Sequence, residues 1–391
     1  MRRLLWIIFG FYAQFLVAQN FRQDIITGAE QFERYVPQLT GKRVAVVANQ
    51  TSVVGNTHLV DTLLAKGVNV VKVFAPEHGF RGKADAGEHV KNDIDVKTGL
   101  PIISLYGKNK KPSAHQLHDV DAVVFDIQDV GARFYTYIST MHYVMEACAE
   151  NVKEFWVLDR PNPNGFYIDG PVLKKKFKSF VGMHPIPVVH GLTVGELAMM
   201  INGEKWLKNG IECDLKVVSC ENYTHKDLYQ LPIKPSPNLP NMSAVFLYPS
   251  LCFFEGTVIS VGRGTDKPFQ VFGHPLLTNT TYDFVPVAMP GAANPKLKGE
   301  VCHGFDLSEF GLKEMPKYKG LYLNWLINAY KNYPKKEEFF NEQFFDLLAG
   351  TDQLRLQIIE GKTEKEIKQS WQEDLNAYKQ LRKKYLLYED F

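Results

Sequence analysis

Short runs of apolar, mostly β-branched residues recur through the first half of the chain, separated by stretches with helical spacing. The runs cover residues 43–48, 68–75, 102–105, 121–127 and 155–158. Leucines at positions 59, 63 and 64 indicate a helix after the first run, and a second helix is expected over about 137–150. Nearly continuous apolar runs are typical of strands buried on both faces, so the pattern predicts a parallel sheet covered by helices. Since crossovers between parallel strands are right-handed, this is an α/β, Rossmann-like open sheet.

The pattern changes after about residue 165. A helix is expected over 191–207, where Thr193 and Glu196 have the spacing of a capping box. A strand-like run at 215–218 and a proline-rich stretch at 231–249 follow, and the last third is helical, ending in a helix over 364–385. The 391 residues exceed the roughly 250–300 at which a single core stops growing, so two domains are expected. We place the first at 25–165, extending as far as about 235, and the second at 236–391.

The N-terminus has the pattern of a signal peptide. Arg2 and Arg3 precede an apolar run that ends near Ala18, and the chain then becomes polar. We therefore expect residues 1–18 to direct export, to the periplasm, and no membrane association after their removal. Without these two arginines, the 45 basic residues become 43, equal to the 43 acidic ones. A neutral mature chain argues against nucleic acid as a partner.

Polar side chains follow the ends of the predicted parallel strands. Asn49 follows the first, Glu77 and His78 the second, and Asp126 and Asp129 the fourth. In open parallel sheets the ligand crevice lies beyond the carboxyl ends of the strands, so these residues are expected to converge on one site.

The chain lacks the sequence motifs of several well-known nucleotide and metal sites. The first strand is not followed by G-x-G-x-x-G, and the chain contains neither G-x-x-x-x-G-K-[ST] nor H-E-x-x-H. We therefore expect no cofactor and no metal. The five cysteines lack C-x-x-C spacing, and burial as small apolar residues is at least as plausible as a Cys213–Cys220 disulfide.

Six ordered motifs together resemble a known family, the bacterial exo-β-N-acetylmuramidases, long described as a domain of unknown function. The motifs are EHGFRG at 77–82, DAGE at 85–88, FDIQDVGARFYTY at 125–137, DRPNP at 159–163, and EGT at 255–257 with GRGT at 262–265. The resemblance extends over about residues 25–391. It implies a smaller α+β C-terminal domain, an active cleft between the two domains, and release of N-acetylmuramic acid from the non-reducing ends of peptidoglycan fragments.

Glycosidic cleavage usually needs one carboxylic acid to protonate the leaving oxygen and a second carboxylate as nucleophile or base. Glu77 is the first choice for the acid, followed by Glu88, with Asp126 and Asp129 as partner candidates. The acetamide of the substrate could instead attack, and the sequence does not separate these mechanisms.

The muramic lactyl carboxylate calls for a planar cation, for which Arg133 and Arg263 are the candidates. The remaining expected substrate contacts are Asn49, His78, Tyr137 and Glu255. The alternative function is a non-catalytic periplasmic protein that binds a muropeptide or sugar between two domains.

Overall fold

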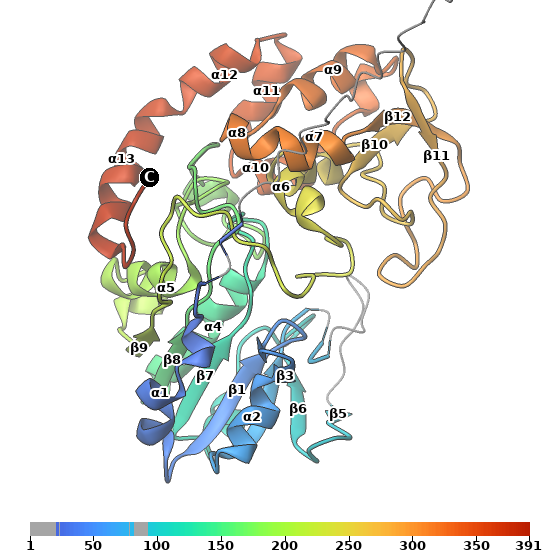
Figure 1. Ribbon diagram of the computed structural model, residues 1–391. Helices are drawn as coiled ribbons and strands as arrows, with labels where there is room; N and C mark the ends of the chain where they lie inside the picture. The colour runs from blue at the N-terminus through green and yellow to red at the C-terminus, as the bar shows by residue number, and fades with distance from the viewer. Residues whose placement is uncertain (1–20, 23, 78, 82–92) are drawn as a thin grey trace, which may run out of the picture.

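A computed structural model describes residues 21–22, 24–77, 79–81 and 93–391. The expected signal segment, His78 and Glu88 lie outside the described residues. Figure 1 shows two lobes: the first half of the chain forms the lower one, around a sheet, and most of the second half forms the upper one.

The lower lobe contains a seven-stranded sheet in the order β5-β6-β4-β1-β7-β8-β9 among the described residues. All neighbouring strands are parallel except β5 and β6. Numbered in chain order, the six parallel strands lie side by side in the order 3-2-1-4-5-6, which is the Rossmann order. The direction in which strands are added to the sheet changes between β1 and β7. The strands are β1 (Arg43–Ala48), β4 (Asn69–Ala75), β5 (Asp93–Ile94), β6 (Pro101–Ser104), β7 (Ala122–Asp126), β8 (Glu154–Leu158) and β9 (Asp214–Val218).

Both faces of this sheet are buried, as the apolar runs predicted. On β1, Ala45 and Val47 face one hydrophobic core, and Val44 and Val46 face the other. Successive strand residues point to opposite faces, so a continuous apolar strand needs cover on both sides. The first core includes helices α4 (Tyr137–Glu150) and α5 (Val194–Gly203), and the second includes α1 (Phe32–Leu39) and α2 (Leu59–Ala65). Short elements complete this lobe: the β2–β3 hairpin (Val53–Val54 and Thr57–His58), α3 (Ala114–Leu117), and the 3-10 turns η1 (Gly28–Glu30), η2 (Lys175–Phe177) and η3 (Lys208–Gly210).

The upper lobe begins with α6 (Met242–Leu251) and the 3-10 turn η4 (Cys252–Gly256). An antiparallel sheet in the order β10-β12-β11 follows, formed by Val271–His274, Cys302–Asp306 and Tyr282–Phe284. The rest is helical: α7 (Ser308–Lys313), α8 (Met315–Tyr318), α9 (Asn324–Asn332), η5 (Lys336–Glu338), α10 (Glu342–Ala349) and α11 (Gln353–Ile359). The expected α/β domain followed by an α+β region is confirmed.

The expected C-terminal helix is divided in two. Helix α12 (Glu364–Ser370) ends at Trp371, and α13 (Gln372–Arg382) continues in a different direction, with the turn η6 (Lys383–Tyr385) after it. The Trp371 indole donates a hydrogen bond to Asp169 of the lower lobe at 3.2 Å. Figure 1 shows α13 running down toward α5, after which the last residues turn back up beside α13 to the C-terminus.

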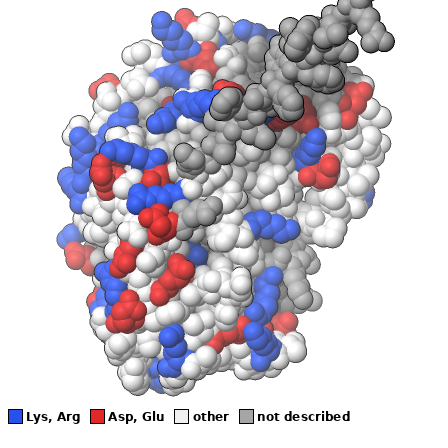
Figure 2. All heavy atoms as spheres, viewed as in Figure 1, with Lys and Arg blue, Asp and Glu red and all other residues white. Residues whose placement is uncertain are grey.

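The cysteines and the surface add little chemistry. All five cysteines are free and buried, so Cys213 and Cys220 form no disulfide. Within the described ranges, no helix has both the length and the apolar character needed to cross a bilayer. On the face shown in Figure 2, basic and acidic side chains are interspersed over much of the described surface.

Candidate active site

A cavity of about 150 Å³ lies where the ends of β4 and β7 meet the upper lobe. The lower lobe contributes Glu77, which follows β4, and residues 134–137, which lead into α4. The upper lobe contributes Tyr248 of α6, Glu255 of η4 and Arg263. Since strand ends of the sheet and the second lobe both line it, the cavity occupies the position expected for a ligand in this sheet order.

Glu77 is held at the end of β4 by a tight turn. Gly79 has a φ of +76° and donates its N–H to the Pro76 carbonyl at 3.0 Å. The Glu77 carboxylate accepts a hydrogen bond from the Thr136 hydroxyl at 3.1 Å. These contacts place a half-buried carboxylate in the cavity wall.

Arg263 enters the cavity from the opposite lobe on a glycine turn. Gly262 and Gly264 have φ values of +74° and +84°, and a Cβ at Gly262 would lie 2.4 Å from Val271. The guanidinium donates to Glu255 at 2.9 Å. Burial alone would lower the pKa of Arg263, but the charges of Glu255 and, more weakly, Glu77 outweigh burial and leave the pKa above its ordinary value. The cation therefore stays charged in its ion pair with Glu255.

Lys296 supports the turn that carries Glu255. Its amine donates to the carbonyls of Phe254 at 3.2 Å and Ile259 at 3.1 Å, and also to those of Glu255 and Thr257. Burial of the amine lowers the pKa of Lys296 to about 8, with Glu255 opposing the change. The amine thus ties together the segment 254–259, from which Glu255 projects toward Arg263.

Aromatic side chains form another wall. The rings of Phe134 and Tyr248 meet edge to face at 5.3 Å, and Tyr135 packs against Tyr137 at 4.9 Å and Tyr248 at 5.8 Å. Burial raises the pKa of Tyr137, and the charge of Glu77 raises it further. The Tyr137 hydroxyl is a neutral hydrogen-bonding group close to the candidate acid.

Three other predicted residues lie at the ends of β1 and β7 but do not line the cavity. Asp126 is fully buried and is bound by the Arg160 guanidinium at 2.6 and 2.9 Å. The Asn49 side-chain oxygen accepts from Thr51. Asp129 accepts from the Gly131 N–H at 2.6 Å. These contacts hold the three side chains beside the strand ends, and their predicted catalytic and substrate-binding roles stay predictions.

Arg133 is likewise separated from the cavity. Its guanidinium is fully buried and donates to four backbone carbonyls, at distances of 2.7 to 3.0 Å. Burial lowers the pKa of Arg133 to about 9. Two of the carbonyls belong to residues 171 and 186 and two to residues 348 and 349, so Arg133 joins the lobes rather than facing a substrate. The lactyl carboxylate then has Arg263 as its candidate partner among the described residues.

The proline-rich stretch contributes a wall that the sequence analysis had not assigned to the site. Ser236, Asn238 and Leu239 line the cavity. The stretch is held there by the Tyr135 hydroxyl, which donates to the Pro235 carbonyl at 2.7 Å, and by the Asn238 amide, which donates to Gly291. The sequence feature that could have identified this wall is the set of small polar residues between prolines, because prolines fix the backbone around them.

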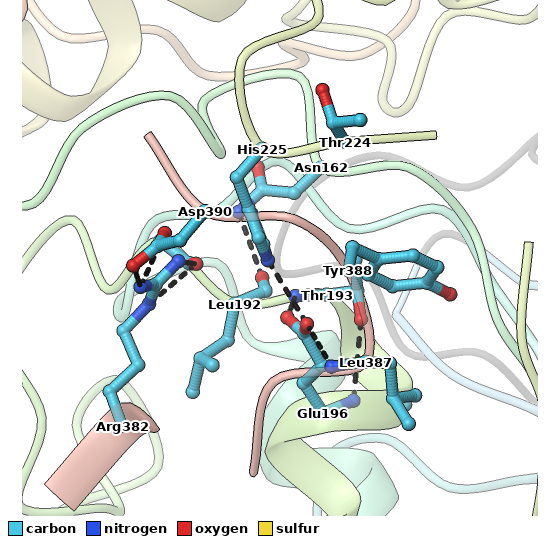
Figure 3. Close-up of polar contacts among 12 residues, drawn as sticks. Asn162, Leu192, Thr193, Glu196, Thr224, His225, Arg382, Leu387, Tyr388 and Asp390 are labelled. Atoms are coloured by element: carbon cyan, nitrogen blue, oxygen red, sulfur yellow. Dashed lines mark hydrogen bonds and ion pairs between the residues drawn. The ribbon is translucent and has the colours of Figure 1, made fainter. Parts of the chain in front are cut away.

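A second buried polar cluster lies elsewhere, where the C-terminal segment meets α5 (Figure 3). The Glu196 carboxylate lies 3.0 Å from the His225 ring and accepts the N–H of Leu387 at 2.9 Å. The Tyr388 hydroxyl donates to Asp159 at 2.5 Å. Asp159 therefore binds the chain end. Within the described ranges, no group of three or more His, Cys, Asp or Glu residues is arranged to hold a metal ion.

Two family models match nearly the whole chain. The N-terminal domain of exo-β-N-acetylmuramidase NamZ matches residues 44–243, and the C-terminal domain matches residues 246–388. The chain belongs to the NamZ exo-β-N-acetylmuramidase family. It is thus a glycosidase of the exo-β-N-acetylmuramidase class, and the family resemblance seen in the motifs is confirmed.

Named and solved relatives agree with this family. The chain is 42% identical over 376 residues to the peptidoglycan β-N-acetylmuramidase NamZ of Bacillus subtilis strain 168, a match covering 90% of this chain and 89% of the relative. Two crystal structures of DUF1343 family proteins from Bacteroides fragilis NCTC 9343 share the fold, each covering 94% of this chain and 100% of the solved one. Their TM-scores are 0.88 and 0.79, at 51% and 34% identity.

Proposed function

We propose that this protein releases terminal N-acetylmuramic acid from the non-reducing ends of peptidoglycan fragments, using a carboxylate as general acid. The observation that carries the proposal is one cavity that brings Glu77, Glu255 and Arg263 together in a member of the NamZ family. The B. subtilis relative, named for action on peptidoglycan, supports the substrate. A pocket rather than an open groove suits an enzyme that acts on chain ends.

Each side chain has a distinct role in this proposal. Glu77 protonates the leaving oxygen, and Arg263 binds the lactyl carboxylate, since a guanidinium matches the planar carboxylate geometry. Glu255 orients Arg263 through its 2.9 Å ion pair. Either a second carboxylate or the acetamide of the substrate attacks the anomeric carbon and water then releases the sugar, or a second carboxylate acts as base and activates water for direct attack. Glu88 and His78 remain predicted contributors from the motifs next to Glu77.

We also propose that the protein works outside the cytoplasm, in the periplasm. The proposal rests on the N-terminal pattern of two arginines followed by an apolar run. Appearance of activity and of a shortened N-terminus in a periplasmic extract would support it, and retention of the full chain in the cytosolic fraction would contradict it.

The test of function compares a chromogenic β-N-acetylmuramide with the matching β-N-acetylglucosaminide. We expect turnover of the muramide, and Glu77→Gln should lower kcat by about 10²–10⁴-fold, the usual contribution of a general acid. Glu300→Gln, an exposed carboxylate of the upper lobe, is the matched control and should leave kcat unchanged. Arg263→Met should raise KM for the muramide far more than for the glucosaminide.

Two outcomes would contradict the proposal. Full activity of Glu77→Gln would remove Glu77 as the acid. Absence of turnover of either substrate, together with tight calorimetric binding of the free sugar, would instead favour the sugar-binding protein considered from the sequence.

A further inference from the structure

A second cavity of about 320 Å³ lies in the upper lobe, between α9 and the antiparallel β10–β12 sheet. Figure 1 shows α9 and this sheet at the top of the molecule. The cavity shares no lining residue with the cavity around Glu77. Its volume falls within the roughly 300–1,000 Å³ of small-molecule sites.

Aromatic rings form one side of this cavity. Tyr322 and Trp325 are half-buried, and their ring centroids lie 4.4 Å apart. Phe310 packs edge to face on both, at 5.5 Å from Tyr322 and 5.3 Å from Trp325. A cluster of this kind fixes the orientation of the two rings that line the cavity, so their remaining surface is a preformed platform for a flat apolar face.

Neutral polar groups surround the platform. Asn324, Asn328 and Asn332 are spaced by four residues, so they lie along one stripe of α9. Thr278 and Thr280 line the same cavity from the loop after β10. None of these five side chains makes a hydrogen bond to any residue that the structure describes. Five amide and hydroxyl groups are thus available to a ligand at a single cavity.

The lining contains no charged side chain among the described residues. An anionic ligand such as the muramic lactyl group would find no cation there, in contrast to Arg263 in the first cavity. Ring faces combined with unpaired amides and hydroxyls match a pyranose, which has an apolar face and a rim of hydroxyls. The apolar floor, Phe272, Leu277 and Leu307, suits the methyl of an acetamido group.

We propose that this second cavity binds a neutral N-acetylated hexosamine unit of a glycan chain. The choice of sugar rests on the proposed function, since a chain of alternating sugars would present such neutral units beside the muramic ones. Binding of a neighbouring or distant unit there would hold a polymer on the enzyme while its end is cleaved.

The test is calorimetric titration of the full protein with tri-N-acetylchitotriose, in the presence of saturating N-acetylmuramic acid to fill the first cavity. We expect Trp325→Ala to weaken binding at least about tenfold, because aromatic anchors dominate such sites. Asn328→Ala should weaken it several-fold. Asn376→Ala, an exposed asparagine on α13, is the matched control and should have no effect.

Activity on the small chromogenic muramide should be unchanged in all three variants, which also shows that they are folded. No detectable binding of the trisaccharide to the wild-type protein would overturn the proposal, as would equal binding by wild type, Trp325→Ala and Asn328→Ala. The two proposals can fail separately. If the proposed function is wrong, the muramide is not turned over, but trisaccharide binding still depends on Trp325.

Discussion

At the scale of single residues, Asp126 shows how a carboxylate at a strand end can be structural. It is fully buried, and Arg160 binds both of its oxygens. We predict that Asp126→Asn lowers the free energy of unfolding by about 3–5 kcal/mol, because it leaves Arg160 buried without a counter-charge. Urea unfolding checks this, alongside muramide turnover at a temperature where the variant is folded. Normal stability with abolished turnover would contradict this structural role and support the catalytic role predicted from the sequence.

Lys296 supports the candidate active site, although it does not line the cavity. Its amine holds the carbonyls of the turn that carries Glu255. We predict that Lys296→Met lowers kcat/KM for the muramide about tenfold, mainly through KM, since Glu255 then orients Arg263 less well; a tenfold loss corresponds to about 1.4 kcal/mol.

Lys298→Met is the matched control for this prediction. Lys298 is exposed, and among the described residues its amine donates to the Ala293 carbonyl alone, at 3.5 Å, so its loss should leave kcat/KM unchanged. Equal effects of the two substitutions, or an effect of Lys296→Met on the glucosaminide alone, would contradict a role in orienting Arg263.

At the scale of elements, the last residues of the chain close over the lower lobe. The Tyr388 hydroxyl donates to Asp159 and accepts the N–H of Cys220 at 2.8 Å (Figure 3 shows Tyr388 beside α5). Burial raises the pKa of Asp159 to about 6, although the bond from Tyr388 opposes the rise. Ionised Asp159 therefore depends on its donors, and the chain end supplies one of them.

We predict that Tyr388→Phe lowers the free energy of unfolding by about 1–3 kcal/mol at pH 7.5, the cost of leaving buried polar groups unpaired. Because the folded pKa of Asp159 lies above its unfolded value of 3.8, the stabilisation from this group is present at low pH and is lost as the pH rises through 6. Loss of the Tyr388 hydroxyl as a donor matters most when Asp159 is ionised. The destabilisation caused by Tyr388→Phe should therefore be smaller at pH 4.5.

Denaturant titrations of both proteins at the two pH values provide the measurement. Tyr385→Phe is a suitable comparison and should cost less, since the Tyr385 hydroxyl donates to the partly exposed Glu204 at 2.6 Å. An effect of Tyr388→Phe that is independent of pH would show that Asp159 is not the group responsible.

The sheet could be predicted at this scale because its signal is local. The expected runs match the central strands to within two residues, and the helix expected over 137–150 is α4. The break at Trp371 could not be predicted, since it accompanies a bond to Asp169, two hundred positions away in sequence. The site is likewise predictable only where its signal is local. The turns that carry Glu77 and Arg263 can be recognised in the sequence as glycine-rich motifs. The carbonyls that surround Arg133 come from segments distant in sequence, so its burial could not be predicted.

At the scale of the whole molecule, the two lobes share one hydrophobic core. The largest cluster of buried residues extends from Val123 and Phe125 of the sheet to Leu326 and Phe345 of the upper lobe. The rings of Phe134 and Phe253 meet across the boundary at 5.8 Å. Arg133 adds hydrogen bonds to carbonyls of α10, from the opposite side of that boundary. Neither lobe can lose its packing without exposing apolar surface of the other.

We therefore predict a single calorimetric unfolding transition, although a chain of this length often unfolds in steps. Because residues of both lobes line the cavity, N-acetylmuramic acid should raise the temperature of that one transition, and at a concentration 100 times its Kd it should add about 2.7 kcal/mol to the free energy of unfolding. Glu77→Gln should retain this shift and Arg263→Met should reduce it, since only Arg263 is assigned to the lactyl carboxylate. Two resolved transitions, of which the sugar moved just one, would show that the lobes are energetically independent and that the sugar binds within a single lobe.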